Sequence, residues 1–142
     1  MAGADTEAWL QSEGWAPRTG KGFSQLVGPL WTRREADGWA YGLLASDAHA
    51  NPAGLVHGGL IATLLDHALS TIAWDAMARQ PCVTVQLDTH YLAAARPGQF
   101  LAVRGRVMRK TSSLVFMQGE LQADGEIIAS AQAMLKRTGS PG

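Results

Sequence analysis

The chain has 142 residues, which suits one domain whose core is large enough to fold without metals or disulfides. Its 12 Lys and Arg balance 12 Asp and Glu, and the absence of a net basic field argues against nucleic-acid binding. Cys82 is the single cysteine and cannot form a disulfide within the chain, which favours a reducing compartment. The sequence has no run of about 18 uncharged apolar residues and no pattern of a signal peptide, so we expect a cytoplasmic protein without membrane contacts.

The first part of the chain predicts a short helix and a hairpin. Residues 5–14 favour a short amphipathic helix, and we interpret residues 1–22 as a peripheral segment. Two extended runs between Leu26 and Leu44 flank Asp37-Gly38, a pair that favours the positive φ angles of a tight turn. An antiparallel strand pair is therefore expected here.

The strongest periodic signal follows an irregular loop at residues 46–56. Apolar residues recur in pairs four apart, which makes one broad stripe on a helix: Leu60, Ile61, Leu64, Leu65, Ala68, Leu69, Ile72, Ala73 and Ala76. The pattern predicts a helix from His57-Gly58-Gly59 to about Ala78. At roughly 20 residues and about 30 Å, it is long enough to run through the core.

The remaining chain alternates with period two. In the first strand the pattern places Val83, Val85, Leu87, Thr89 and Tyr91 on one face and Thr84, Gln86, Asp88 and His90 on the other. Further strands follow, with a hairpin at Asp124-Gly125 and a frayed tail at residues 139–142. The order predicts a single α+β domain over residues 1–142, with an antiparallel sheet of about six strands around one long helix.

The segment from Asn51 to Gly59, followed by Asp66, resembles the signature of the hotdog-fold thioesterase superfamily, in particular its phenylacetate-pathway (PaaI-like) branch. In that branch an Asn, a His-Gly-Gly six residues later and a carboxylate nine residues after the His recur, and this chain has all of them at those spacings. The resemblance extends over about residues 26–138. It implies a hotdog fold, acyl-CoA thioesterase activity, and an active site at a subunit interface of a homodimer that pairs into a homotetramer.

Physical arguments point to the same residues. A helix N-terminus offers unpaired N–H groups to a developing oxyanion, so Gly58 N–H is a candidate to hold the thioester carbonyl, and Gly59 allows close approach. Asp66 lies on the flank of the apolar stripe, where its carboxylate can activate water as a general base or attack as a nucleophile. We favour water activation, and we expect Asp66 and the Gly58 amide to touch one reacting carbonyl.

Supporting roles are assigned to residues near this pair. His57 can orient the loop, polarise the thioester or simply cap the helix, and Asn51 can position water or substrate or simply form a turn. Thr63 and Ser70 share the helix flank with Asp66. Thr84 aligns with a hydroxyl residue that, in the resembled family, lies near the site across the dimer interface.

A basic and hydroxyl-rich cluster is the candidate contact for the nucleotide of coenzyme A. It contains Arg104 and Arg106 and continues with Arg109, Lys110, Thr111, Ser112 and Ser113. The alternative is a charged edge that prevents aggregation between strands. The histidines lack metal-ligand spacing, so neither a metal nor a cofactor is expected beyond the coenzyme A of the substrate.

The sequence therefore predicts hydrolysis of acyl-CoA to a free acid and coenzyme A. The alternatives are a non-catalytic acyl-CoA sensor and a hotdog hydratase acting on enoyl or 3-hydroxyacyl thioesters. A carrier-protein thioester could replace coenzyme A, and the identity of the acyl group is left open by the sequence.

Overall fold

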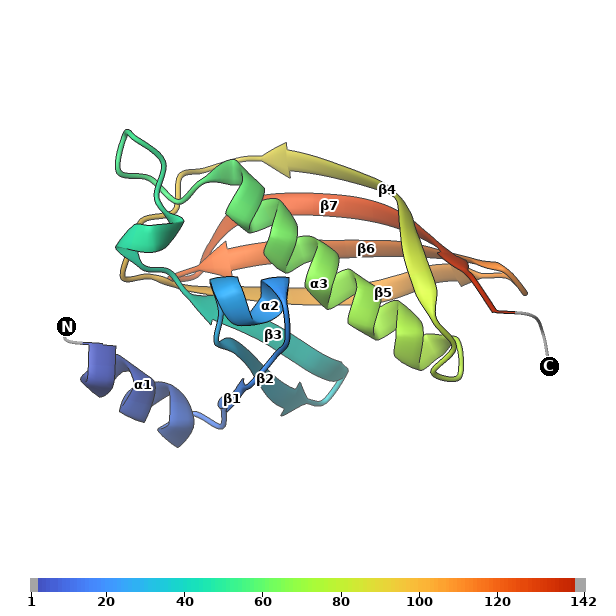
Figure 1. Cartoon of the computed structure of the whole chain (residues 1–142), viewed down its shortest axis with the longest axis horizontal. Coiled ribbons are helices and arrows are strands. Elements are labelled where there is room, and N and C mark those ends of the chain that lie inside the picture. The colour runs from blue at the N-terminus through green and yellow to red at the C-terminus, as the bar shows by residue number, and fades with distance from the viewer. Residues whose placement is uncertain (1–2, 140–142) are drawn as a thin grey trace.

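The structure is a computed structural model that describes residues 3–139 (Figure 1). Its helices are α1 (Gly3–Ser12), α2 (Phe23–Val27), a 3-10 turn η1 (Asp47–His49) and α3 (Gly58–Ala76). Its strands are β1 (Ala16–Arg18), β2 (Leu30–Glu35), β3 (Gly38–Leu44), β4 (Cys82–Tyr91), β5 (Phe100–Lys110), β6 (Leu114–Ala123) and β7 (Glu126–Arg137). Residues 140–142 of the expected frayed tail lie outside the described range.

All seven strands belong to one antiparallel sheet in the order β1-β2-β3-β5-β6-β7-β4. The sheet curves around α3, which crosses it on one face (Figure 1). The predicted α+β architecture is confirmed, with one strand more than expected. The additional strand is β1, whose three residues are too few to show an alternating pattern. No helix within residues 3–139 is long and apolar enough to cross a bilayer.

Both predicted hairpins are present, and the turn of one of them lies one residue earlier than expected. Asp124 and Gly125 have φ angles of 51° and 78°, so both occupy the left-handed region that this tight turn requires. In the β2–β3 hairpin Gly38 already pairs with Glu35, which moves the turn one residue earlier than Asp37-Gly38. Residues 23–27 form α2, although we expected extended chain from Leu26 onward.

The predicted apolar stripe forms the buried face of α3. Its fully buried members are Leu60, Ile61, Leu64, Leu65, Ala68, Leu69 and Ala73. The helix ends at Ala76, two residues before the predicted end, because Ala78 and Arg79 adopt positive φ angles of 55° and 62°. The Lys110 ammonium donates to the Ala76 carbonyl at 3.0 Å, which satisfies an acceptor that the helix end leaves open.

Leu69 fixes the height of α3 above the sheet. Gly105 of β5 and Gly119 of β6 are direct register partners, and both face Leu69. A methyl group on Gly105 would lie 2.5 Å from Leu69 Cδ2, and one on Gly119 would lie 2.9 Å from it. The helix can approach the sheet this closely only because neither residue has a side chain.

We expect Gly105→Ala to lower the free energy of unfolding by about 1–3 kcal/mol through overpacking, and Leu69→Ala to lower it by about 2–5 kcal/mol through a cavity. In the double variant the new methyl group partly fills the space that Leu69 leaves, so its loss should be smaller than the sum of the single losses. Urea titration of the four proteins measures this coupling. Additive losses would contradict a direct contact.

The N-terminal segment is attached to the opposite face of the sheet. Leu10 of α1 and Trp15 form a second buried cluster with Trp31, Ala40 and the partly buried Phe100. By strand alternation this cluster lies on the face turned away from α3. The predicted peripheral segment is therefore packed against the sheet by aromatic contacts, including a Trp15–Phe100 edge-to-face pair at 4.8 Å.

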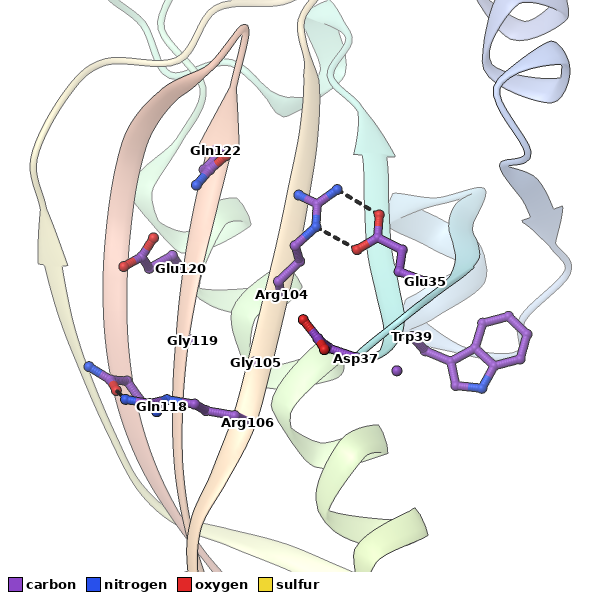
Figure 2. A pocket seen from close by; sticks show the side chains of 11 residues that line it. Glu35, Asp37, Trp39, Arg104, Gly105, Arg106, Gln118, Gly119, Glu120 and Gln122 are labelled. Carbon is purple, nitrogen blue, oxygen red and sulfur yellow. Dashed lines mark hydrogen bonds and ion pairs between the residues drawn. The ribbon is translucent and has the colours of Figure 1, made fainter.

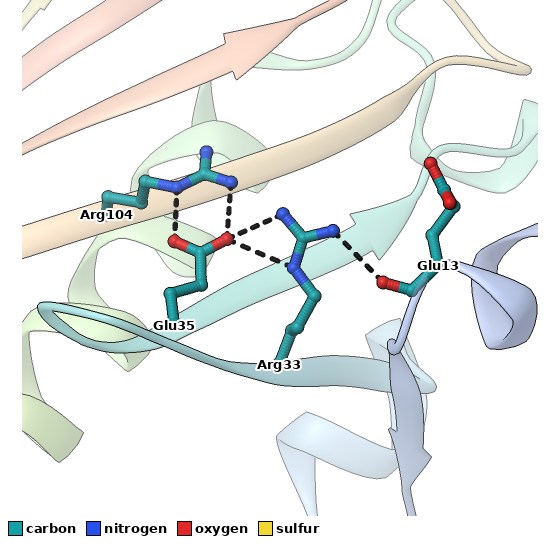
Figure 3. A network of polar contacts seen from close by, with 4 residues as sticks. All are labelled: Glu13, Arg33, Glu35 and Arg104. Carbon is teal, nitrogen blue, oxygen red and sulfur yellow. Dashed lines mark hydrogen bonds and ion pairs between the residues drawn. The ribbon is translucent and has the colours of Figure 1, made fainter.

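Glu35 links this segment to the middle of the sheet (Figure 3). Its carboxylate accepts from Arg104 Nε and Nη2 at 2.7 and 2.8 Å and from Arg33 Nη2 at 2.6 Å. Arg33 also donates to the Glu13 carbonyl at 3.2 Å. The hydrogen bonds from Arg104, with a further contribution from Arg33 and against the opposing effect of burial, lower the pKa of Glu35 from 4.5 to about 2.

Because the folded state lowers the pKa of Glu35, its stabilisation is fully present above pH 4.5 and is lost as the pH falls toward 2. We expect Glu35→Gln to lower the free energy of unfolding at pH 7 by about 1–3 kcal/mol, as for hydrogen bonds to charged groups. The difference from wild type should shrink between pH 4.5 and 2. Chemical denaturation across that range measures it, with the exposed Glu126→Gln as control, and a constant difference would contradict the assignment.

Candidate active site

The first turn of α3 leaves one backbone N–H without a partner. His57 is the N-cap, and its Nδ1 accepts from Gly59 N at 2.8 Å. The His57 carbonyl accepts from the N–H groups of Leu60 and Ile61 at 3.0 and 3.2 Å. Among the N–H groups from His57 to Ile61, only that of Gly58 has no acceptor within residues 3–139, since His57 N–H donates to His49. It is also the amide that the sequence singles out as the oxyanion donor.

A chain of hydrogen bonds fixes the approach to this turn. His57 N donates to the His49 carbonyl at 2.8 Å. His49 Nδ1 in turn accepts from Ser46 N at 3.0 Å, and its Nε2 lies 2.8 Å from the Val27 carbonyl of α2. The His57 side chain caps the helix, and its expected role in orienting the loop or polarising the thioester stays a prediction. Its ring accepts the Gly59 N–H, so Gly59 has no free amide for a substrate.

Asp66 is half-buried on the flank of α3, and two hydroxyls adjoin it. Thr84 Oγ1 donates to Asp66 Oδ1 at 2.6 Å, and Ser70 Oγ lies 3.3 Å from Thr84 Oγ1. Since Thr84 gives its only hydroxyl hydrogen to Asp66, Ser70 must donate to Thr84. Asp66, Ser70 and Thr84 thus meet within one chain, and the expectation that Thr84 lies across a subunit interface from the rest of the site stays a prediction.

A β-bulge explains how Thr84 reaches the helix. Simple alternation along β4 puts Thr84 on the face opposite Leu87, and this prediction is wrong. The register against β7 shifts between Thr84 and Gln86, so that Thr84 and Leu87 both face α3. Val83 and Val85 are then about half exposed, at 51% and 52%. One extra residue in the strand therefore turns a hydroxyl toward Asp66.

Two other predicted residues are engaged locally. Asn51 Oδ1 accepts from the N–H groups of Ala53 and Leu55 at 3.0 and 3.1 Å, which makes the side chain part of the loop that leads into α3. Thr63 Oγ1 donates to the Gly59 carbonyl at 2.8 Å, one turn earlier in the helix. Both residues shape the helix entry.

The expectation that Asp66 and Gly58 meet one carbonyl fails within a single chain. Eight residues separate them on the continuous helix Gly58–Ala76, which corresponds to about 12 Å along its axis. A carbonyl group in contact with both groups spans only about 7 Å. Side-chain rotation cannot close this gap, because the amide belongs to the helix backbone.

The residues predicted to bind coenzyme A lie at the other end of α3. Lys110 holds the Ala76 carbonyl, and Thr111 Oγ1 accepts from the N–H groups of Ser113 and Leu114 at 3.3 and 2.9 Å, closing the β5–β6 turn. Arg109 and Ser112 are exposed there. This turn is separated from Gly58 by most of the 19-residue helix.

A cavity of about 560 Å³ lies over β5 and β6 beside the β2–β3 hairpin (Figure 2). Arg104, Arg106 and Gln118 line it, together with Trp39 from the hairpin. The Arg104 guanidinium is held by Glu35, and Arg106 Nη2 donates to Gln118 Oε1 at 2.9 Å. Neither Asp66 nor Gly58 borders the cavity, so it is separate from the candidate site.

Tyr91 is a neighbour of Gly58 that the sequence reasoning missed. Its hydroxyl donates to the Gly58 carbonyl at 2.8 Å from the end of β4. In the sequence Tyr91 is only one more residue of an alternating strand. Tyr91 and Gly58 are 33 positions apart in the sequence, and no local pattern joins them.

Comparisons with known proteins agree with this fold and helix entry. The family model of the thioesterase superfamily matches residues 53–129. A Pseudomonas aeruginosa protein named as an esterase is 32% identical over 77% of this chain and 83% of its own length. Human acyl-coenzyme A thioesterase 13 is 28% identical over 79% of this chain and 82% of its own.

Solved structures show the same arrangement. A phenylacetic acid degradation-related protein of Ralstonia eutropha superposes with a TM-score of 0.66 at 25% identity, covering 91% of this chain and 89% of that one. A Bacillus halodurans protein solved with CoA superposes with a TM-score of 0.77 at 22% identity, covering 96% and 89%. The long helix in a curved antiparallel sheet is the hotdog fold, as predicted. The chain belongs to the thioesterase superfamily, and the solved structures that it resembles include proteins of the PaaI-like branch.

Proposed function

We propose that the protein hydrolyses acyl-CoA thioesters to a free acid and coenzyme A. The observation that carries the proposal is the N–H of Gly58 at the start of α3, which has no acceptor in the described part of the chain. A thioester carbonyl develops negative charge as it is attacked, and a fixed amide at a helix N-terminus stabilises that charge. The names of two relatives, an esterase and an acyl-coenzyme A thioesterase, support the same chemistry.

Asp66 activates the attacking water. The Thr84 hydroxyl, backed by Ser70, holds one carboxylate oxygen and leaves the other to accept a proton from water. The water oxygen bonds to the carbonyl carbon, the C–S bond breaks, and the proton taken up by Asp66 returns to the departing thiolate. The alternative mechanism is direct attack of the Asp66 carboxylate on the thioester carbonyl. This attack releases the thiolate and forms an acyl-enzyme anhydride, which water then cleaves.

The site is completed by a second copy of the chain. Because about 12 Å separates Asp66 from the Gly58 amide along one helix, the two groups that share a carbonyl come from different copies. The edge strand β4 is suited to this association. One of its edges pairs with β7, the other has no partner within residues 3–139, and its exposed residues include Val83 and Val85.

Antiparallel pairing of two β4 strands reverses one copy relative to the other. The start of α3 in one copy then approaches the middle of α3 in its partner, where Asp66 lies, and the β5–β6 turn lies beyond it at the end of that helix. Arg109 and Ser112 of that turn are exposed and available to the nucleotide of coenzyme A. We propose the homodimer as the catalytic unit, with two dimers pairing into a tetramer as the resemblance implies.

The first prediction concerns Asp66. We expect Asp66→Asn to lower kcat for acyl-CoA hydrolysis by about 10²–10⁴-fold, because an amide cannot take the proton from water. Thiol release from a panel of aliphatic and aromatic acyl-CoA esters measures it. The matched control is Asp75→Asn, an exposed acid of the same helix, which should retain full activity.

Three outcomes would contradict the assignment. Full turnover in Asp66→Asn at unchanged oligomer mass would remove Asp66 from the mechanism. A wild-type protein that binds acyl-CoA without releasing thiol would be a sensor. Water addition to an enoyl thioester without thiol release would indicate a hydratase.

The second prediction isolates the Gly58 amide. Gly58 is the first helical residue, and His57 has the extended backbone, φ −62° and ψ 135°, that a following proline requires. Gly58→Pro therefore removes the N–H at a position suited to proline, whereas Gly58→Ala retains it. We expect kcat of Gly58→Pro to be about 10²–10³-fold below that of Gly58→Ala.

The same variant tests whether the site uses two copies. When Gly58→Pro and Asp66→Asn chains are refolded together, mixed dimers contain one site with both functional groups, so activity should exceed the sum of the two separate variants. Equal kcat in Gly58→Pro and Gly58→Ala would exclude the amide as oxyanion donor. A mixture no more active than its parts would contradict a site shared between two copies.

A further inference from the structure

Tyr91 holds the peptide group next to the proposed oxyanion donor. It is the last residue of β4, and its side chain faces α3, opposite Ala129 in the register with β7. Its hydroxyl donates to the Gly58 carbonyl at 2.8 Å. The ring lies along the same residue, since a methyl group on Gly58 would be 3.4 Å from Tyr91 Cε1.

The two peptide groups of Gly58 are fixed by different partners. The N–H belongs to the His57–Gly58 peptide, whose carbonyl accepts from Leu60 and Ile61. The Gly58 carbonyl belongs to the next peptide, whose N–H donates to His57 Nδ1 and whose oxygen accepts from Tyr91. Only the φ and ψ angles of a glycine connect these groups, and glycine resists rotation less than any other residue. Tyr91 therefore restrains the residue whose amide direction matters.

This hydrogen bond is not needed to satisfy the Gly58 carbonyl. Within a regular α-helix that carbonyl already faces the N–H of Ala62 one turn later. The Tyr91 side chain is also 52% exposed, so burial does not require it to find this partner. The Tyr91 hydroxyl is thus a second donor to the carbonyl of Gly58, the residue whose N–H has no acceptor in the described chain. This indicates that Tyr91 orients Gly58.

We propose that Tyr91 is a positioning residue that orients the Gly58 amide toward the developing oxyanion. This inference rests on the proposed thioester hydrolysis and adds to it a residue outside the Asn, His-Gly-Gly and Asp pattern. A donor stabilises the transition state only when it is already aimed at the oxyanion, so loss of the restraint lowers kcat more than it raises KM.

The test compares Tyr91→Phe with Tyr41→Phe in the full-length protein, with acyl-CoA as substrate and thiol release as the readout. Tyr91→Phe keeps the ring and removes the hydroxyl, and we expect kcat to fall about 5- to 50-fold with KM within about twofold. Tyr41 is the other of the two tyrosines in the chain, and its ring lies beside that of His67, with 6.0 Å between the ring centroids. Tyr41→Phe should leave kcat unchanged.

A double-mutant cycle with Gly58→Pro separates positioning from a general structural role. When the amide is absent there is nothing to orient, so Tyr91→Phe should change the residual kcat of Gly58→Pro by less than about twofold. An equal fall of kcat in both backgrounds, which loss of folded enzyme would also produce, overturns the proposal.

Three further results would overturn the positioning role of Tyr91. They are an unchanged kcat in Tyr91→Phe, a raised KM with unchanged kcat in that variant, and an equal loss of kcat in Tyr41→Phe. Failure of the underlying function is recognised separately, because a wild-type protein without thioester hydrolysis would show no kcat to compare.

Discussion

The contact of Leu69 with the paired glycines Gly105 and Gly119 determines where α3 lies. Gly105 and Gly119 have no side chains and lie opposite each other in the register, so they leave a depression that accepts the Leu69 side chain. Asp66 lies one turn before Leu69 and Ser70 directly after it. The same contact therefore sets the distance from the helix flank to β4, which the Asp66–Thr84 hydrogen bond requires. The packing of the core and the polar cluster depend on each other.

The start of α3 shows how a helix terminus becomes a specific donor. The first N–H groups of any helix lack acceptors within it, and here those of Gly59 and Leu60 are satisfied by the ring and the carbonyl of His57, whose own N–H donates to His49. His57 is itself held through His49 to α2. Among residues 3–139 this leaves one free amide at the helix start, that of Gly58, which the proposed oxyanion stabilisation requires.

The sequence predicted the features that repeat along the chain or depend on neighbouring residues. The apolar stripe of α3 and the positive-φ turn at Asp124-Gly125 are of this kind, and the spacing from Asn51 to Asp66 identified the helix entry. The features that it missed depend on residues far apart in the chain. The bulge that turns Thr84 toward Asp66 appears only in the register with β7, and the Tyr91–Gly58 contact needs both β4 and α3 in place. Asn51 has the expected position, but its side-chain oxygen is engaged in the loop.

The rigidity of α3 gives assembly a direct place in the proposed chemistry. An α-helix rises about 1.5 Å per residue and does not shorten, so no rearrangement within one chain brings the Asp66 carboxylate to the Gly58 amide. The residues that prepare each group are also separate, since His57 and Tyr91 act at the helix start whereas Thr84 and Ser70 act beside Asp66. In the proposed site each chain thus contributes two separate parts, and the hydrogen bonds that hold one part do not involve the other. In the proposed dimer, association through the β4 edge brings these two preformed parts together, so that the proposed site contains both a charge-stabilising amide and a base.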